Sequence, residues 1–319
     1  MTVDVTVVIC TYNRYDVLPS AIGSLTRQTA PATSFEVIVV DNSPSELKSQ
    51  QNSKQFVGIP NLQWVYEATP GLSNARNVGL SLAKGEIVAY IDDDAIAEPD
   101  WIEELQAAFS VSGPTTVCVG GKVEPIWSVP RPSWLHDDLL GYVSVVDWVA
   151  DGPRLLGTKE WVAGTNISFL VKPLREIGGF STTLGRKGGG QVLLSNEETE
   201  VTEKMQANGG TVIYAPGVIV HHLVEPGRLK QEWFRRRVAW QANSDYLKEP
   251  TAAFDRARSH WSDVTSFFSQ LPPTHRNPNG FLVELDDPRL FKAQLSAIYN
   301  FMTCILAGFH GIEAPGLLR

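Results

Sequence analysis

The sequence predicts an α/β fold, in which a mostly parallel central sheet is flanked by helices and followed by a helical C-terminal extension. Apolar runs rich in β-branched residues alternate with helical patterns over residues 1–112, which is typical of parallel strands joined by right-handed crossovers. After residue 250 the patterns are helical or irregular. The 319 residues, 43% of them hydrophobic, are enough for one large domain or two small ones.

The first half of the chain contains four short apolar runs that we expect to be strands. They cover residues 3–10, 35–40, 62–66 and 87–91. Helical patterns follow at three places: up to residue 27, over 71–84 and from residue 99. Ser73 is a candidate cap of the second helix, and Gly85 ends it.

The second half has a different rhythm. We expect strands at residues 115–123, 161–171 and 211–220, and helices at 195–208 and 229–247. Ser195 and Glu198 have the spacing of a capping box. Residues 124–158 are rich in Pro, Trp and Gly without periodicity, which indicates a lid or a binding segment. The glycine-rich run at 185–190 lacks the spacing of a phosphate loop and favours a flexible lid.

Three consecutive carboxylates end the fourth strand, at Asp92, Asp93 and Asp94. Like charges this close raise each other's proton affinity, so the arrangement favours a counter-charge such as a divalent cation. The carboxyl ends of strands are also where open α/β sheets bind ligands. The alternative is a solvated acidic turn before the next helix.

Composition excludes some classes of protein. A net charge of -8 argues against a nucleic-acid-binding protein. The three cysteines are far apart and odd in number, which predicts no disulfide framework and a reducing cytosol. We expect no signal peptide, because the N-terminus leads straight into a strand without a basic region. We expect no transmembrane helix, because the apolar stretch 295–309 is shorter than the ~20 residues that a span needs.

Four motifs resemble, in order, spacing and identity, the nucleotide-sugar motifs of family 2 glycosyltransferases with the GT-A fold. They are Val7–Arg14 (VVICTYNR), Val39–Ser43 (VVDNS), Gly71–Asn77 (GLSNARN) and Tyr90–Asp94 (YIDDD). A looser likeness continues to about residue 240 through GTN at 164–166, GGF at 178–180, NEETE at 196–200 and HH at 221–222. The resemblance implies a Rossmann-like GT-A domain over 1–245, with a nucleotide-sugar half (1–112) and an acceptor half (113–245), and an extension over 246–319.

For the donor, the resemblance implies that Asp41 reads a uracil ring, that Thr11 and Tyr12 lie near the base, and that Asp92 faces the ribose. An Asx turn at Asp41 and core packing of Tyr12 are the structural alternatives. Asp93 has no definite role. Arg14 and Arg76 are expected to supply positive charge to the diphosphate, since a planar guanidinium suits phosphate. Either arginine is otherwise a surface residue that pairs with an acid.

For the metal, the resemblance implies that Asp94 binds Mn²⁺ or Mg²⁺ bridging the diphosphate, which then acts as a Lewis acid. His221 or His222 is a candidate third ligand, with a slight preference for His221. A purely structural role for both histidines is the alternative.

For the base, the resemblance places Glu198 at the position that deprotonates the acceptor hydroxyl during inverting transfer. The family usually has Asp there, so Glu197 stays a candidate. Acids favoured at a helix N-terminus by the dipole are the structural alternative, which suits Glu200 and Glu203 best.

The acceptor is predicted to be a saccharide or a lipid-linked saccharide, as in polysaccharide or glycoconjugate biosynthesis. Trp127 and Trp161 are candidates to stack on its sugar rings, with burial in the core as the alternative. The 229–247 helix, with Trp233 and residues 235–237 (three arginines), indicates either peripheral contact with anionic lipid at the inner face of the membrane or a solvated face.

Two other functions compete with sugar transfer. A nucleotidyltransferase would need a glycine-rich basic loop, and residues 11–14 contain no glycine. A sugar-nucleotide-binding protein without catalysis fits poorly with the intact acidic triplet and with the pair Glu197 and Glu198. The sequence therefore favours a metal-dependent glycosyltransferase of the hexosyltransferase type that uses a nucleotide sugar, most simply a UDP-sugar.

Overall fold

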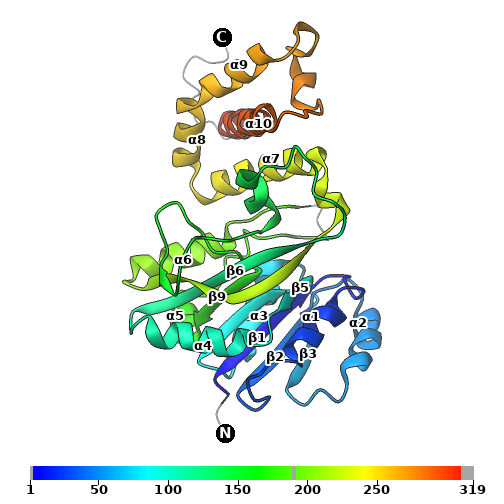
Figure 1. The fold of residues 1–319 in the computed structure, drawn as a ribbon, viewed down its shortest axis with the longest axis vertical. Helices are drawn as coiled ribbons and strands as arrows, with labels where there is room; N and C mark the ends of the chain where they lie inside the picture. The colour runs from blue at the N-terminus through cyan, green and yellow to red at the C-terminus, as the bar shows by residue number, and fades with distance from the viewer. Residues whose placement is uncertain (1–2, 189–191, 310–319) are drawn as a thin grey trace. The chain divides into compact units, whose positions relative to one another are not determined.

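The computed structural model describes residues 3–188 and 192–309 and is shown in Figure 1. Its chain divides into two compact units. Unit 1 contains Met1–Ile126, Ser144–Gln191 and Glu197–Leu223, and unit 2 contains Trp127–Val143, Val192–Asn196 and Val224–Arg319. The last residues of the predicted glycine-rich lid, 189 and 190, lie outside the described residues. The predicted division at residue 245 stays a prediction.

A nine-stranded mixed sheet forms the centre of unit 1, in the order β3-β2-β1-β4-β8-β6-β9-β5 with β7 paired to β9. The first four strands along this order are parallel, whereas β8 pairs antiparallel with both β4 and β6. The strands are β1 (Val5–Thr11), β2 (Phe35–Asp41), β3 (Leu62–Tyr66), β4 (Ile87–Asp92), β5 (Ala95–Ala97), β6 (Thr116–Trp127), β7 (Arg154–Leu155), β8 (Asn166–Leu170) and β9 (Thr211–Val224). The predicted α/β fold is confirmed, and its parallel part is the N-terminal half.

Helices cover both faces of this sheet. Strands β1, β2 and β4 are buried on both faces, which explains their uninterrupted apolar runs. One apolar cluster joins alternate residues of these strands to α1 (Leu18–Leu25) and α4 (Trp101–Val111). The other cluster joins the remaining residues to α3 (Leu72–Leu82), α5 (Val171–Glu176) and α6 (Glu197–Ala207). The polar helix α2 (Glu46–Ser53), which the sequence analysis missed, buries only Ser49.

Strand register brings the polar strand ends to one edge of the sheet. Thr11 pairs with Asp41, which in turn pairs with Tyr66, and Cys10 pairs with Asp92. The carboxyl ends of four parallel strands therefore meet, as expected for a ligand-binding edge.

Several predicted boundaries differ from the structure. The strand expected at 161–171 begins only at Asn166, because its N–H bonds the carbonyl of Ala163 in a turn (2.9 Å). The strand expected at 211–220 continues to Val224, so both histidines lie inside it. Ser73 caps nothing: its hydroxyl donates to the carbonyl of Leu184 (2.9 Å), and Gly71 is the N-cap of α3.

Unit 2 is mainly helical. Its helices are α7 (Gln231–Lys248), α8 (Pro250–Ser259), α9 (Trp261–Gln270) and α10 (Pro288–Phe309). It also has 3₁₀ turns at Asp137–Val143, Pro226–Leu229, Pro273–His275 and Pro278–Phe281. A further 3₁₀ turn, Lys54–Phe56, belongs to unit 1. Trp134, Phe234 and Phe291 pack edge to face in its interior, with ring centroids 5.0 to 6.2 Å apart.

Helix α10 is longer than the sequence predicted. It has 22 residues, and by length and composition alone it is long and apolar enough to cross a membrane. However, its polar Gln294 and Thr303 are buried inside unit 2 together with Phe291 and Leu295. Of its apolar window Pro288–Gly308, 39% is buried.

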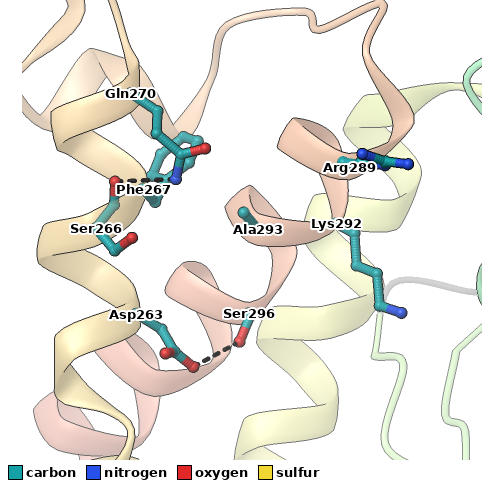
Figure 2. Close-up of a pocket in the computed structure, with 8 residues that line it drawn as sticks. All are labelled: Asp263, Ser266, Phe267, Gln270, Arg289, Lys292, Ala293 and Ser296. Carbon is teal, nitrogen blue, oxygen red and sulfur yellow. Dashed lines mark hydrogen bonds between the residues drawn. The ribbon is translucent and has the colours of Figure 1, made fainter.

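A cavity of about 300 Å³ lies between α9 and α10 (Figure 2). Asp263 and Ser266 line it from α9, and Arg289, Lys292 and Ser296 line it from α10. None of the residues predicted to form the site belongs to this cavity.

Candidate active site

The acidic triplet lies at the end of β4, where the backbone turns towards β5. Asp93 and Asp94 are each 6% exposed, and Asp92 is half-buried. Asp92 accepts a hydrogen bond from the Thr165 hydroxyl (2.6 Å). Burial and the neighbouring charge of Asp94 raise the pKa of Asp93, whereas Arg14 opposes this rise. Two buried carboxylates in succession thus create the excess of negative charge that the sequence indicated.

Arg14 partly neutralises this charge. Its Nε lies 3.3 Å from Asp93 Oδ1, and its Nη2 lies 2.9 Å from Asp94 Oδ2. The structure therefore brings Arg14 to the triplet as a counter-charge. Its expected contact with a diphosphate stays a prediction.

Only one of the two histidines joins the triplet. In the pairing of β5 with β9, Ala95 faces His222, which is 1% exposed and places Nε2 3.3 Å from Asp94 Oδ1. Successive strand residues point to opposite faces, so His221 instead contacts Glu98 (2.5 Å) and Glu124 (3.5 Å). The slight preference for His221 is not supported by this geometry.

Asp92, Asp94 and His222 form a group that fits a divalent cation. One ligand atom from each lies within 4.8 Å of the others, and two members are buried. Two carboxylates and an imidazole suit Mn²⁺, and the carboxylates alone suit Mg²⁺. Among the described residues, this is the group of three possible metal ligands whose donor atoms lie within 4.8 Å of one another.

Asp41 is fully buried at the end of β2. Its Oδ2 accepts from the Tyr15 hydroxyl (2.9 Å), and its Oδ1 accepts from the backbone N–H (3.0 Å) and hydroxyl (2.5 Å) of Ser43. The Asx turn that was the structural alternative is thus present. Thr11 is buried beside it, and Tyr12 is half-buried.

Arg76 lies inside unit 1 at 3% exposure, against the rings of Tyr90 (5.8 Å) and Phe180 (5.3 Å). Its Nη1 bonds Glu197 Oε1 at 3.0 Å. Burial lowers the pKa of Arg76, but the charges of Glu198 and Glu197 outweigh it and raise that pKa above its usual value. The guanidinium is therefore the internal partner of the predicted catalytic pair, and its role towards a diphosphate stays a prediction.

The two glutamates that begin α6 have different surroundings. Glu197 is 3% exposed, and burial together with the charge of Glu198 raises its pKa against the opposing effect of Arg76. Glu198 is half-buried, and its Oε1 accepts from the backbone N–H of Gly164 (3.1 Å). A Cβ on Gly164 would lie 2.3 Å from Arg76 Nη2 and 2.5 Å from Glu198 Oε1, so only glycine leaves room for this contact.

Residues 164 and 165 join the two halves of the site. Gly164 holds Glu198, and Thr165 holds Asp92, so the glutamate pair and the acidic triplet attach to adjacent residues. Next to them, Asn166 fixes this segment by donating to the carbonyls of Lys122 (2.9 Å) and Val218 (2.8 Å). The predicted general base is thus linked through these residues to a candidate cation site.

Comparison with known proteins agrees with this geometry. Residues 6–138 match the model of glycosyl transferase family 2. The glucosyl-dolichyl phosphate glucuronosyltransferase of Haloferax volcanii is 31% identical over 322 residues, which cover 99% of this chain and 98% of that protein. The chain belongs to glycosyltransferase family 2. The succinoglycan biosynthesis protein ExoM of Rhizobium meliloti is 25% identical, over 74% of this chain and 72% of that protein.

Solved structures confirm the GT-A fold of this glycosyltransferase. The mannosyltransferase PcManGT from Pyrobaculum calidifontis, in complex with GDP-Man and Mn²⁺, superposes with a TM-score of 0.55 at 21% identity, over 98% of this chain and 76% of that one. TarS 1-349 from S. aureus, in complex with UDP, gives 0.54 at 18% identity, over 97% and 92%.

The tryptophans predicted to bind an acceptor have separate surroundings. Trp161 belongs to unit 1, where it packs on the core and accepts at its carbonyl from Trp148 Nε1 (2.9 Å). Trp127 begins unit 2, with the Arg131 guanidinium 5.9 Å from its ring. Both are half-buried. Their contact with an acceptor stays a prediction.

The basic aromatic surface expected on α7 is only partly present. Trp233 packs edge to face on Phe234 (5.2 Å). Arg235 is buried and binds Glu284 (2.7 Å). Of its three consecutive arginines, only Arg236 is exposed.

Sequence reasoning missed the residues that hold the predicted ones in place. Tyr15, next to the first motif, binds Asp41, and Thr165, inside the GTN motif at 164–166, binds Asp92; their place beside or within these motifs is the only local signal. Asn42 donates to the carbonyls of Glu67 and Thr69 (2.7 Å each) and accepts from Gly71 (2.7 Å). These contacts join segments 25 to 29 residues apart, which no local pattern reveals.

Proposed function

We propose that this family 2 glycosyltransferase moves a sugar, with inversion, from a UDP-linked donor to a saccharide carried on a polyprenyl-type lipid phosphate. The observation that carries the proposal is the joining of Glu198 and Asp92 through adjacent residues. The lipid-linked acceptor and an acidic sugar donor are supported by the likeness, over 99% of the chain, to a glucosyl-dolichyl phosphate glucuronosyltransferase.

Glu198 is the general base in this proposal. Its Oε1 is held by Gly164, and its buried Oε2 lacks a hydrogen-bond partner among the described residues. That second oxygen is available to take the proton of an acceptor hydroxyl as the hydroxyl attacks the anomeric carbon. Glu197 is tied to Arg76 inside the fold, so we assign it to orienting the pair and not to proton transfer.

Asp92, Asp94 and His222 would hold the cation. When bound, a divalent metal supplies a Lewis acid that neutralises the charge on the departing nucleoside diphosphate. Arg14 would then turn part of its charge from the triplet towards the phosphates. The 2.9 Å separation of its Nη2 from Asp94 Oδ2 supports this role beside the cation.

Asp41 supports uridine as the base. Its Oδ1 already accepts two hydrogen bonds from Ser43, whereas its Oδ2 accepts one from Tyr15 and can accept one more. A uracil N3–H is a suitable donor for that additional bond. A lipid-linked acceptor also implies that the protein works at a membrane surface, which we propose to be peripheral and cytoplasmic.

The test uses ligand binding before turnover. UDP, GDP, dTDP and CMP are each added with and without Mn²⁺, and the melting temperature is measured, since a ligand that binds the native state raises it. We expect a Mn²⁺-dependent increase with UDP that Asp94→Asn abolishes. A shift of equal size with GDP or dTDP would overturn the assignment of uridine.

Turnover is then measured with UDP-glucuronate and UDP-glucose on a short-chain polyprenyl phosphate glucose. NMR of the product gives the anomeric configuration. Transfer with inverted configuration is the expected result. A product with retained configuration would contradict the role of Glu198, because a single base does not preserve the anomeric centre.

A further inference from the structure

The residue before the catalytic helix has an unusual backbone. Asn196 has φ +77°, in the left-handed region that non-glycine residues rarely adopt. It precedes Glu197, the first residue of α6. An asparagine here would ordinarily cap the helix with its side-chain oxygen. In this protein the side chain points instead into unit 2.

Both ends of the Asn196 amide are bound to α7. Its Nδ2 donates to Asp245 Oδ1 (2.6 Å), and its Oδ1 accepts from Gln241 Nε2 (2.9 Å). The preceding Ser195 is held in the same way, because its N–H donates to Ser244 Oγ (3.0 Å) and its hydroxyl donates to Gln241 Oε1 (3.0 Å). The predicted capping box of Ser195 is thus replaced by contacts with α7.

Asp245 is itself fixed by α10. The Tyr299 hydroxyl donates to Asp245 Oδ2 at 2.6 Å, and Gln241 Nε2 also reaches Asp245 Oδ1 (2.8 Å). Burial, followed by the contact with Asp245, raises the pKa of Tyr299, so its hydroxyl keeps its proton and stays a donor. Hydrogen bonds to an ionised carboxylate are stronger than neutral ones. We call Asn196, Gln241, Asp245 and Tyr299 the Asn196 anchor.

We propose that the Asn196 anchor restrains the backbone immediately before α6 and thereby positions the catalytic Glu198. Asn196 belongs to unit 2, and the next residue, Glu197, belongs to unit 1. The peptide bond between them carries the constraint into the first turn of α6. This inference rests on the proposed function, which assigns Glu198 as the base.

Two restraints then define the position of the Glu198 carboxylate. Gly164 binds its Oε1, and the anchor holds residue 196, one peptide bond before α6. Loss of the anchor would free the first turn of the helix. A misplacement of about 1 Å at a reacting group costs on the order of 100-fold in rate. The donor site would not change, since none of its predicted residues belongs to the anchor.

The test separates backbone conformation from anchoring. Asn196→Gly keeps the left-handed φ without the amide, whereas Asn196→Ala loses both. Asp245→Asn and Tyr299→Phe weaken the anchor from its other side. Tyr142→Phe is the matched control, because this tyrosine packs edge to face on Phe234 in unit 2 and its hydroxyl makes no hydrogen bond in the described part of the chain.

Each variant is assayed for kcat and KM with UDP-glucuronate and the short-chain lipid-linked glucose. Affinity for UDP with Mn²⁺ is measured by calorimetry, and deuterium exchange is measured on peptides covering residues 192–207. We expect Asn196→Ala and Asp245→Asn to lose roughly 10- to 100-fold in kcat, with UDP affinity within about twofold of the parent. Tyr299→Phe should show a smaller loss, and exchange in α6 should be faster in all three.

If kcat is unchanged in Asn196→Ala and Asp245→Asn while Glu198→Gln is inactive, the positioning role of the anchor is overturned and the proposed function stands. An active Glu198→Gln would overturn the proposed function, and the exchange rates then decide whether the anchor restrains α6. If Asn196→Ala does not fold, Tyr299→Phe against Tyr142→Phe decides the outcome, because each removes a single hydroxyl.

Discussion

The ion pair between Arg76 and Glu197 gives a quantitative test of how the catalytic carboxylates are supported. The two side chains are 3% and 4% exposed, and their charged atoms are 3.0 Å apart. Replacing Arg76 by Met keeps most of the stem but leaves Glu197 buried beside Glu198. Removing one partner of a buried pair costs about 3–5 kcal/mol, because the other charge stays desolvated. We therefore expect Arg76→Met to lose about 4 kcal/mol of unfolding free energy at pH 9, where Glu197 of the parent is ionised.

A double-mutant cycle isolates the pair. Glu197→Gln removes the charge that Arg76→Met leaves unpaired, so the double variant should recover about 2–3 kcal/mol relative to the sum of the single losses. Urea unfolding at pH 9 provides the free energies. The loss in Arg76→Met should shrink at pH 6, because burial raises the pKa of Glu197 to about 8 and this pKa rises further without Arg76, so the carboxyl is then neutral. Additive losses, or a loss below about 1 kcal/mol, would refute the buried pair.

Three further predictions concern other parts of unit 1. Burial alone would raise the pKa of Glu36, but hydrogen bonds from Lys84 hold it below its usual value, so its stabilisation is present above about pH 4.5 and is lost as the pH falls further. Between pH 6 and pH 3, the unfolding free energy measured in urea should therefore fall less for Glu36→Gln than for the parent. An equal fall in both proteins would contradict this. His222→Ala should weaken Mn²⁺-dependent UDP binding on the order of 10-fold or more in calorimetry, whereas the adjacent His221→Ala should not. The opposite result would show that the metal ligand is His221, on the other face of β9. Gly164→Ala should lower kcat by at least about tenfold, since its Cβ would displace the glutamate pair, and full activity would show that the close contact is not needed.

Local sequence patterns were sufficient for the parallel half of the sheet. Residues 5–11, 35–41 and 87–92 are apolar without alternation because helices cover both faces, and the acidic triplet follows the last of them directly. The polar helix Glu46–Ser53 gave no such signal, because it buries only one residue.

The partners of the site residues depend on contacts far apart in the chain. Sequence alone left both His221 and His222 as candidate ligands, with a slight preference for His221, and only the register of β9 against β5 separates them. Arg76 reads locally as a surface or phosphate-binding arginine, yet its partner Glu197 lies 121 residues away. No periodicity or motif encodes a pairing across such a distance.

The general base is the centre of the mechanism, and one comparison tests it most directly. Transfer from UDP-glucuronate to the short-chain lipid-linked glucose is measured for Glu198→Gln and for Glu200→Gln, with UDP affinity measured in parallel in the presence of Mn²⁺. Glu200 is a suitable control because it pairs with Lys204 along the same helix (2.9 Å). We expect Glu198→Gln to lose on the order of 100-fold or more in kcat while it keeps its UDP affinity, and Glu200→Gln to stay near the parent. Full transfer by Glu198→Gln would contradict its role as the base.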